Sequence, residues 1–270
     1  MSRTGTAHLA LRSQGPATNH RSRGSAHNRS VVIDVHCHIL PALDDGALDL
    51  DDSAAMAAQA AQDGIEVVCA TPHIRSDHLV RVAELPSRRA ALQRELERRG
   101  LDVQIARGAE IAQEKAAMLT DRELRELSLG GGGWVLIEPA PGPLGDDLCA
   151  LVDGLRLRGA RAVVAHPERH AAADFEDRLR ELTARGALIQ WTADFVARAA
   201  AGDLVLGYAG AGLVHLLGSD AHSSRTGRPL RLAAGVAKLR AVCSSAQIAW
   251  IAQEAPRAIL DGVEALTPPW

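Results

Sequence analysis

Short apolar runs rich in Val and Ile alternate along the chain with longer stretches whose apolar residues recur every three or four positions. The short runs predict buried strands, and the longer stretches predict amphipathic helices. Seven strands are predicted, at residues 31–35, 66–70, 103–107, 134–138, 160–165, 187–191 and 213–218. Because helices separate them, these strands are expected to run parallel in an α/β fold.

Glycines mark the ends of several predicted helices. A glycine after the last helical residue adopts a positive φ without steric cost, and it commonly ends a helix before the next strand. Helices with such an ending are predicted at residues 52–63, 84–99, 146–158 and 175–185, and residues 229–266 are also predicted to be mostly helical. No internal repeat or long linker is evident, so residues 31–270 are expected to form a single domain.

Residues 1–30 differ in composition from the rest of the chain. They contain five Arg, three His and no acidic residue, and they show little apolar periodicity. An Arg- and Ser-rich composition is also typical of a transit peptide. We favour a disordered extension, because the segment cannot bury enough apolar surface to offset the entropy lost on ordering. Its histidines, His8, His20 and His27, are therefore excluded from any predicted site.

The composition argues against several classes of partner and compartment. A net charge of −3 and an aromatic content of 3% disfavour nucleic-acid binding, which uses basic surfaces and aromatic stacking. No apolar run approaches the ~20 residues of a membrane-spanning helix. The four cysteines are scattered without a CxxC pair, so we expect no disulfides, no zinc knuckle and a cytoplasmic location.

Polar residues gather at the carboxyl ends of the predicted strands. They occur at residues 34–38, 71–73, 110, 138, 166–170 and 219–222. In an α/β barrel these strand ends meet at one face, where active sites are built, whereas an open sheet draws its site from fewer strands. The distribution therefore favours a barrel over an open, doubly wound sheet.

Five histidines and three carboxylates at or near these strand ends form a candidate metal site. They are His36, His38, His73, His166, His222, Asp44, Glu110 and Asp220. Side chains alternate along a strand, so His36 and His38 point to the same side and Cys37 points away. Burying so many polar groups without an ion would be costly, and this donor set suits Mn, Fe or Zn.

One member of this set has a simpler interpretation, and four polar residues outside the set need interpreting as well. Asp44 precedes a glycine and is also typical of a plain turn. Glu138 ends the fourth predicted strand and is either a ligand or a hydrogen-bond partner of one. His78 and His170 are expected to be solvated or to contact ligands, and His215 is expected to pack inside a strand.

Two arginines accompany the candidate ligands. Arg169 follows His166 by three residues, and Arg228 lies just beyond the "SDAH" run. An arginine beside several metal ligands predicts a phosphate clamp, because its planar fork matches phosphate oxygens. The simpler alternative is an ordinary ion pair, for Arg169 with Glu168 or Asp174.

A competing signature occurs in "CATPHIRS", residues 69–76, which fits the Cys-x5-Arg-Ser pattern of cysteine-dependent tyrosine phosphatases. That chemistry needs an exposed thiolate cradled by backbone N–H groups. Here Pro72 removes one donor, no glycine is present, and Cys69 lies inside a predicted strand where a thiol would be inert. We interpret the match as coincidental.

Five motifs, in order, resemble the polymerase-and-histidinol-phosphatase (PHP) superfamily: "DVHCHILPALDDG", "ATPHI", "GAEI", "AHPERH" and "SDAH…GRP". They are most similar to the metal-dependent tyrosine-protein phosphatases of bacterial capsule and exopolysaccharide loci, and the resemblance covers residues 31–262. It implies a distorted, TIM-like (β/α)7 barrel that holds three divalent ions, commonly manganese. The implied substrate is phosphotyrosine on a partner tyrosine kinase that controls polysaccharide export.

The resemblance also implies individual roles. It divides the ligands among a first ion at His36, His38, Glu110 and Asp220, a second at Glu110 and His166, and a third at Asp44, His73 and His222. Arg169 and Arg228 match the family's phosphate-binding arginines. Independently of the resemblance, His222 or a metal-bound water is expected to assist departure of the phenolate. Such a site suits phosphomonoester hydrolysis by a metal-activated water, and Fe, Zn or Co is compatible with the same donors.

Two other functions stay open at the level of sequence. One is a PHP phosphoesterase acting on a small ester such as histidinol phosphate, and the other is a non-catalytic module that metal ions stabilise. The stretch "IEPAPGP" after the fourth predicted strand departs from the family, in which an aromatic residue usually follows the Glu. Substrate selection is therefore the least determined feature.

Overall fold

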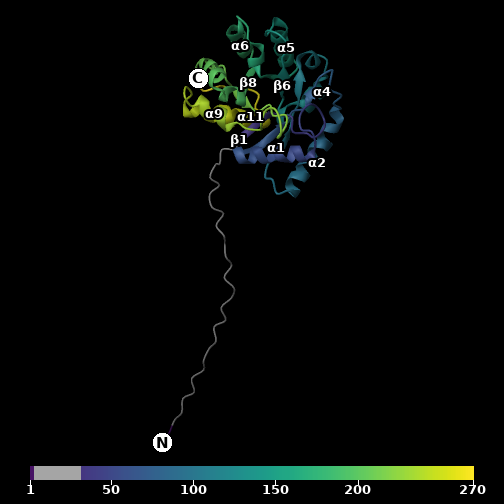
Figure 1. Cartoon of the computed structure of the whole chain (residues 1–270), viewed down its shortest axis with the longest axis vertical. Helices are drawn as coiled ribbons and strands as arrows, with labels where there is room; N and C mark the ends of the chain where they lie inside the picture. The colour runs from purple at the N-terminus through teal and green to yellow at the C-terminus, as the bar shows by residue number, and fades with distance from the viewer. Residues whose placement is uncertain (3–31) are drawn as a thin grey trace. The chain divides into compact units, whose positions relative to one another are not determined.

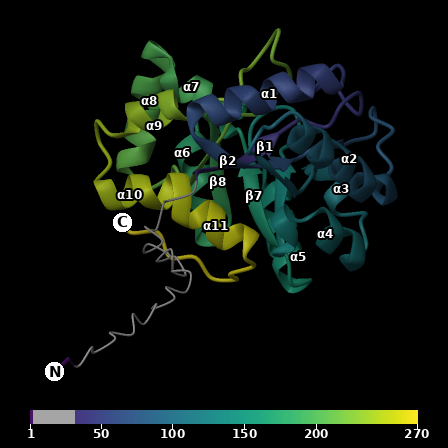
Figure 2. The ribbon, with the colours of Figure 1, turned by 90° about the horizontal axis from the view of Figure 1, so that it is seen from below.

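The computed structural model describes residues 1–2 and 32–270 (Figure 1). From residue 3 onward, the predicted disordered extension lies outside the described residues. In the rest of the chain the strands lie at the centre and the helices surround them (Figure 2). Every pair of neighbouring strands is parallel, as the alternation of strands and helices predicted.

The strands form two sheets. One has the order β1-β2-β4, and the other has the order β3-β5-β6-β7-β8-β9. Their bounds are β1 Val32–Cys37, β2 Ile65–Ala70, β3 His73–Ile74, β4 Gln104–Arg107, β5 Glu110–Ala112, β6 Trp134–Glu138, β7 Arg161–Ala165, β8 Leu188–Thr192 and β9 Leu216–Gly218.

The helices include those predicted and several short ones. The α-helices are α1 Leu50–Asp63, α2 Leu85–Arg98, α3 Gln113–Ala116, α4 Asp121–Leu127, α5 Asp146–Leu157, α6 Phe175–Ala184, α7 Ala193–Ala197, α8 Ala199–Gly210, α9 Ala233–Leu239, α10 Ser245–Ala249 and α11 Ala255–Leu260. Shorter turns are η1 Val82–Glu84, η2 Leu129–Gly131, η3 Pro167–His170 and the π-helical η4 Trp250–Glu254. Gly64 ends α1 with a φ of 83°, as its sequence position predicted.

Each predicted strand is present, but two of them continue into a second short strand after a break. Residues 65–74 contain β2 and β3, and residues 104–112 contain β4 and β5. β2 pairs with β4 in the first sheet, and β3 pairs with β5 in the second. Gly108 lies at the second break, where a Cβ atom would be 2.9 Å from Leu129 Cδ2. The breaks thus carry the chain from one sheet to the other.

The far ends of the two sheets also approach each other. An isolated parallel bridge joins Cys37 to Ala221, and Asp220 N donates to the carbonyl of His36 at 2.8 Å. The buried carboxylate of Asp34 accepts from Ser219 N at 2.9 Å. These bonds bring the segment after β9 beside the end of β1. The described strands nevertheless form two parallel sheets, so the closed barrel stays a prediction.

The core is built mainly from Val, Leu, Ile and Ala on the strands and the inward helix faces. Cys37 is fully buried, as its predicted orientation away from the histidines requires. His215 is buried beside Trp250 and Trp270, and its Nδ1 accepts from Ile189 N at 3.2 Å. It therefore has the packing role predicted for it. Among the described residues, no helix is long and apolar enough to cross a membrane.

Candidate metal centre

The end of β1 projects His36 and His38 to the same side, where they meet two acids from distant parts of the chain. Nε2 of His36 lies 3.2 Å from Oε2 of Glu110 and 3.4 Å from Oδ1 of Asp220. Nε2 of His38 lies 3.2 Å and 3.6 Å from the same two oxygens. The structure thus brings together the four residues that the family resemblance grouped around a first ion.

The spacing of these four atoms suits a shared cation. The two Nε2 atoms face each other at 3.3 Å, and Oε2 of Glu110 is buried without a hydrogen-bond partner. Ligand atoms ~2.0–2.2 Å from one ion lie roughly 2.8 to 3.6 Å from one another in octahedral or tetrahedral geometry. The observed distances fall in that range, so the donors present fit a divalent metal.

Glu110 connects this cluster to the remaining histidines. It begins β5, whose pairing with β3 sets Glu110 beside His73. Its Oε2 lies 3.1 Å from Nδ1 of His73, and its Oε1 lies 2.7 Å from Nε2 of His166. Burial alone would raise the pKa of Glu110, but the surrounding histidines, His36 foremost, hold it well below its usual range. A single buried carboxylate therefore contacts four histidines.

A second cluster contains Asp45, His73 and His222 together with His38, which it shares with the first. Oδ1 of Asp45 lies 3.4 Å from Nε2 of His73 and 3.5 Å from Nε2 of His222. Burial lowers the pKa of both His73 and His222 to about 4. Their rings are consequently neutral near pH 7, with lone pairs available to a cation.

Asp44 differs from its predicted position as a direct ligand in this second cluster. Its Oδ2 accepts from His38 Nδ1 at 2.8 Å and from His73 N at 2.9 Å, and its Oδ1 accepts from Gly46 N at 3.0 Å. Asp45 takes the place in the cluster instead. Gly46 permits the close turn beside these carboxylates, since a Cβ there would lie 2.2 Å from the His38 carbonyl.

Glu138 ends β6 and completes a third cluster with His73 and Glu110. Its Oε2 lies 3.8 Å from Nδ1 of His73, and Arg75 Nη1 donates to both of its oxygens at 3.2 Å. Burial and the neighbouring Glu110 raise its pKa. Of the two roles that the sequence left open, this position beside a second carboxylate favours a ligand.

Hydrogen bonds to the second ring nitrogen orient the histidines. Nδ1 of His36 donates to Oε1 of Gln190 in β8 at 2.8 Å, and Nδ1 of His222 donates to the carbonyl of Asp220 at 2.9 Å. With the proton on Nδ1, Nε2 is left to bind a cation. Gln190 was not found from the sequence, because one glutamine in an apolar strand carries no motif.

Two candidate ligands have strained backbones. His166 has a φ of 30° and Asp220 a φ of 51°, in the left-handed region that non-glycine residues rarely adopt. Such conformations cost on the order of 1–3 kcal/mol and concentrate at functional sites. The strain directs both side chains toward Glu110 and the histidines.

The family model for capsular polysaccharide synthesis, CpsB/CapC, matches residues 32–261. The chain belongs to this family. The tyrosine-protein phosphatase YwqE of Bacillus subtilis (strain 168) is 34% identical over 203 residues, which cover 72% of this chain and 79% of YwqE. The putative tyrosine-protein phosphatase CapC of Staphylococcus aureus is 27% identical over 212 residues, covering 74% of this chain and 80% of CapC.

Solved structures agree with this assignment to the CpsB/CapC family. A structure from crystallographic work on YwqE of Bacillus subtilis and CpsB of Streptococcus pneumoniae, metal-dependent tyrosine phosphatases, matches with a TM-score of 0.75 and 29% identity. The match covers 85% of this chain and 94% of that one. The phosphotriesterase homology protein of Escherichia coli shares the fold alone, with a TM-score of 0.59 at 14% identity over 86% of this chain and 99% of that one. The resemblance to capsule-locus tyrosine phosphatases is thus confirmed.

Two arginines of this CpsB/CapC family member lie beside the first cluster. The guanidinium of Arg169 pairs with Oδ2 of Asp220, and Nε of Arg228 lies 3.1 Å from the same oxygen. Neither Glu168 nor Asp174 is the partner of Arg169; Glu168 instead accepts from Thr192 N at 3.1 Å. Both guanidinium groups are partly exposed, so each retains donors for an incoming anion.

A cavity of about 540 Å³ adjoins the metal clusters. Arg169 and His166 line one part of it, and Glu138 with the Pro-rich segment 139–142 lines another. The segment that departs from the family thus forms a wall of this cavity. Arg75 also lines it, although the sequence did not single out this residue for the site.

Three other residues named from the sequence lie around the centre. The ring of His78 stacks on His73 with centroids 5.3 Å apart, and Nδ1 of His170 donates to the Gly142 carbonyl at 2.7 Å. Cys69 is fully buried in β2, and burial raises the pKa of its thiol. An inert, protonated thiol of this kind does not suit the cysteine-phosphatase signature.

Proposed function

We propose that this protein is a metal-dependent protein-tyrosine phosphatase that hydrolyses phosphotyrosine through a metal-activated water. The observation that carries the proposal is the set of three adjoining donor clusters, two of which share Glu110 while the third shares His38 and His73 with them, with Arg169 and Arg228 beside them. Membership of a family whose named relatives are tyrosine-protein phosphatases supports it.

We propose three divalent ions, with manganese as the preferred metal. The first would be held by His36, His38, Glu110 and Asp220. The second would be held by Glu110, His166 and Glu138, and the third by His73, His222 and Asp45, with Asp44 orienting His38. When bound, such ions lower the pKa of water and offset the negative charge of phosphoryl oxygens.

The chain's own residues supply positioning and charge. Arg169 and Arg228 are proposed to hold the phosphoryl oxygens, because both guanidinium groups converge on Asp220 and keep further donors exposed. His222 is proposed to assist as the phenolate leaves. A phenol has a pKa of about 10, so protonating this leaving group is less demanding than for an alkoxide.

The adjoining cavity supports an aryl ester as the substrate. Its volume of about 540 Å³ is typical of a site for a small ligand or a large side chain. Pro139, Ala140 and Pro141 supply an apolar wall on which a phenyl ring would pack. In this chain they would contact the tyrosine ring where relatives have an aromatic side chain.

We further propose the setting in which the enzyme acts. Its substrate would be a phosphorylated tyrosine kinase of polysaccharide export, and its compartment the cytoplasm, which suits four free cysteines. The two parallel sheets, bridged at Cys37 and Ala221, are proposed to form the distorted seven-stranded barrel that the resemblance implies.

The deciding experiment is hydrolysis of a phosphotyrosine peptide after chelation and re-addition of single metals. Activity is expected to disappear on chelation and to return with a divalent metal, manganese above the others. Histidinol phosphate, tested in parallel, is expected to react far more slowly. No hydrolysis of the peptide with any metal would overturn the proposal, and faster hydrolysis of histidinol phosphate would reassign the substrate.

A further inference from the structure

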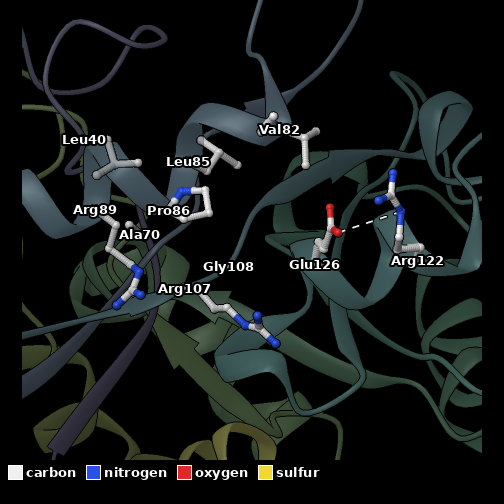
Figure 3. A pocket seen from close by; sticks show the side chains of 11 residues that line it. Leu40, Ala70, Val82, Leu85, Pro86, Arg89, Arg107, Gly108, Arg122 and Glu126 are labelled. Carbon is white, nitrogen blue, oxygen red and sulfur yellow. Dashed lines mark ion pairs between the residues drawn. The ribbon is translucent and has the colours of Figure 1, made fainter.

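A second cavity, of about 350 Å³, shares no lining residue with the metal clusters. It lies where residues after β1, the end of β2 and the end of β4 meet η1, α2 and α4. Figure 3 shows Leu40, Leu85 and Pro86 on one side of it, with Glu126 and Arg122 opposite. Its volume falls at the lower end of the range for small-molecule sites.

The wall of this cavity is held in place by contacts to β4. That strand is the last of its sheet, so one edge has no neighbouring strand to pair with. Helix α2 covers this edge: Arg89 Nη1 donates to the Ile105 carbonyl at 3.0 Å, and Gln93 Oε1 accepts from Ile105 N at 2.8 Å. Hydrogen bonds between α2 and β4 thus fix one wall of the cavity.

The lining combines apolar surface with an excess of positive charge. Three arginines, Arg89, Arg107 and Arg122, face a single acid, Glu126, which lies 3.9 Å from Arg122. Among the residues that the structure describes, Arg107 has no ion-pair partner, and Nε of Arg89 is buried without a hydrogen-bond partner. Unused guanidinium donors beside an apolar surface match an anion with an apolar body.

Arg107 is positioned by its surroundings. Its guanidinium lies against Gly131 of η2, where a Cβ atom would come within 1.8 Å of Nη2. The absence of a side chain at Gly131 therefore leaves the space that this guanidinium occupies. In Figure 3 the side chain runs below the cavity, between the apolar side and Glu126.

We propose that this cavity binds a small amphiphilic anion. Its apolar body would pack on Leu40, Val82 and Leu85, and its phosphate, sulfonate or carboxylate head would pair with Arg107 and Arg89.

Such a ligand would contact segments that lead directly to the metal centre. Leu40 follows His38 by two residues, and Gly108 precedes Glu110 by two. Residues 75–84 border both cavities, with Arg75 bound to Glu138 at one end and Val82 at the other. Occupancy of the cavity is therefore proposed to alter the phosphatase rate. This effect on the rate rests on the proposed function, whereas binding of the anion does not.

Binding is tested by calorimetry on the full, manganese-loaded chain with naphthalene-1-sulfonate as the probe and neutral naphthalene-1-sulfonamide as its control. One equivalent of sulfonate is expected to bind, at least ten-fold more tightly than the sulfonamide. Arg107→Gln is expected to weaken binding at least ten-fold, and Arg94→Gln, an exposed change on α2 outside the cavity, to leave it unchanged. Equal affinity of the Arg107→Gln variant and the natural chain would overturn the site.

The metal centre is a competing location for the probe. Saturating inorganic phosphate is expected to leave sulfonate binding intact, and displacement by phosphate would overturn the proposal. Ala83→Trp places a large ring at an exposed lining position and is expected to abolish binding.

The coupling between the cavity and catalysis is tested with the Ala83→Trp variant. Saturating probe is expected to change kcat/KM of the natural chain at least two-fold and that of Ala83→Trp not at all. An unchanged rate alongside intact binding would overturn the coupling alone. A chain that hydrolyses no phosphotyrosine would overturn the proposed function while leaving the binding result readable.

Discussion

Nδ1 of His38 donates to Oδ2 of Asp44 at 2.8 Å, so Asp44 orients a candidate ligand while its neighbour Asp45 faces the second cluster. Asp45→Asn is therefore expected to remove one metal ion per chain. Asp44→Asn is expected to keep the full number at saturating metal but to weaken metal affinity roughly 10–100-fold. Elemental analysis of the two variants, with calorimetric titration of metal, measures both effects. Loss of an ion from Asp44→Asn but not from Asp45→Asn would restore the assignment made from sequence.

Glu110 contacts four histidines through one carboxylate, so no other single change is expected to disturb the centre as much. Glu110→Gln is expected to lose more than one ion and to lower kcat by on the order of 10³. Glu97→Gln, an exposed change on α2, is the matched control and is expected to match the natural chain. Retention of all ions by Glu110→Gln would contradict the shared role of this carboxylate.

The buried thiol of Cys69 separates metal chemistry from cysteine chemistry. Cys69→Ala is expected to keep its activity on a phosphotyrosine peptide and to lose about 1–2 kcal/mol of unfolding free energy through lost packing. A chelator is expected to abolish activity in both proteins. Peptide assays with and without chelator measure this, and the opposite pattern would point to a thiolate nucleophile.

Arg169 and Arg228 converge on Asp220, so each is expected to contribute to binding the phosphoryl group. Replacing either with Ala is expected to lower kcat/KM by roughly 10²-fold. Replacement with Lys is expected to recover only part of it, since a point charge cannot reproduce the planar fork. Arg225→Ala, which removes an exposed ion pair with Asp49, serves as the control. Full activity of Arg228→Ala would remove this residue from the proposed clamp.

His215 makes stability depend on pH without involving the metal centre. Burial lowers its pKa to about 4, whereas an unfolded histidine titrates near 6.5. Between these values the unfolded chain binds more protons, so the unfolding free energy falls as the pH drops below about 6.5. The loss from this group between pH 7 and pH 5 is expected to be about 2 kcal/mol.

Urea denaturation of the metal-free chain at these two pH values, beside His215→Asn, isolates this contribution. The variant removes the titrating group while its side-chain oxygen can still accept from Ile189 N. It is expected to lose correspondingly less stability at pH 5. An equal loss in both proteins would assign the pH dependence to other groups.

Local pattern was sufficient for the alternating strands and for the placement of His36 and His38 at the end of the first strand, whereas Glu110 begins the additional strand β5. Strand periodicity sets which side a residue faces, and parallel strands bring their carboxyl ends to one edge. The same reasoning could not find the breaks after β2 and β4. They depend on how Gly108 packs against Leu129, a contact between residues distant in the sequence.

The sequence by itself determined the donor types, the strands that carry them and the family to which the chain belongs, because periodicity and motif order are local properties. Only the tertiary structure placed Asp45 in the second cluster and Asp44 on His38, brought Glu138 and Arg75 together, and revealed Gln190 as the partner of His36. Side chains in turns, and hydrogen bonds between different strands, take their directions from neighbours that lie far away along the chain. The arginine-lined cavity beside β4 arises in the same way, from elements whose proximity no local pattern encodes.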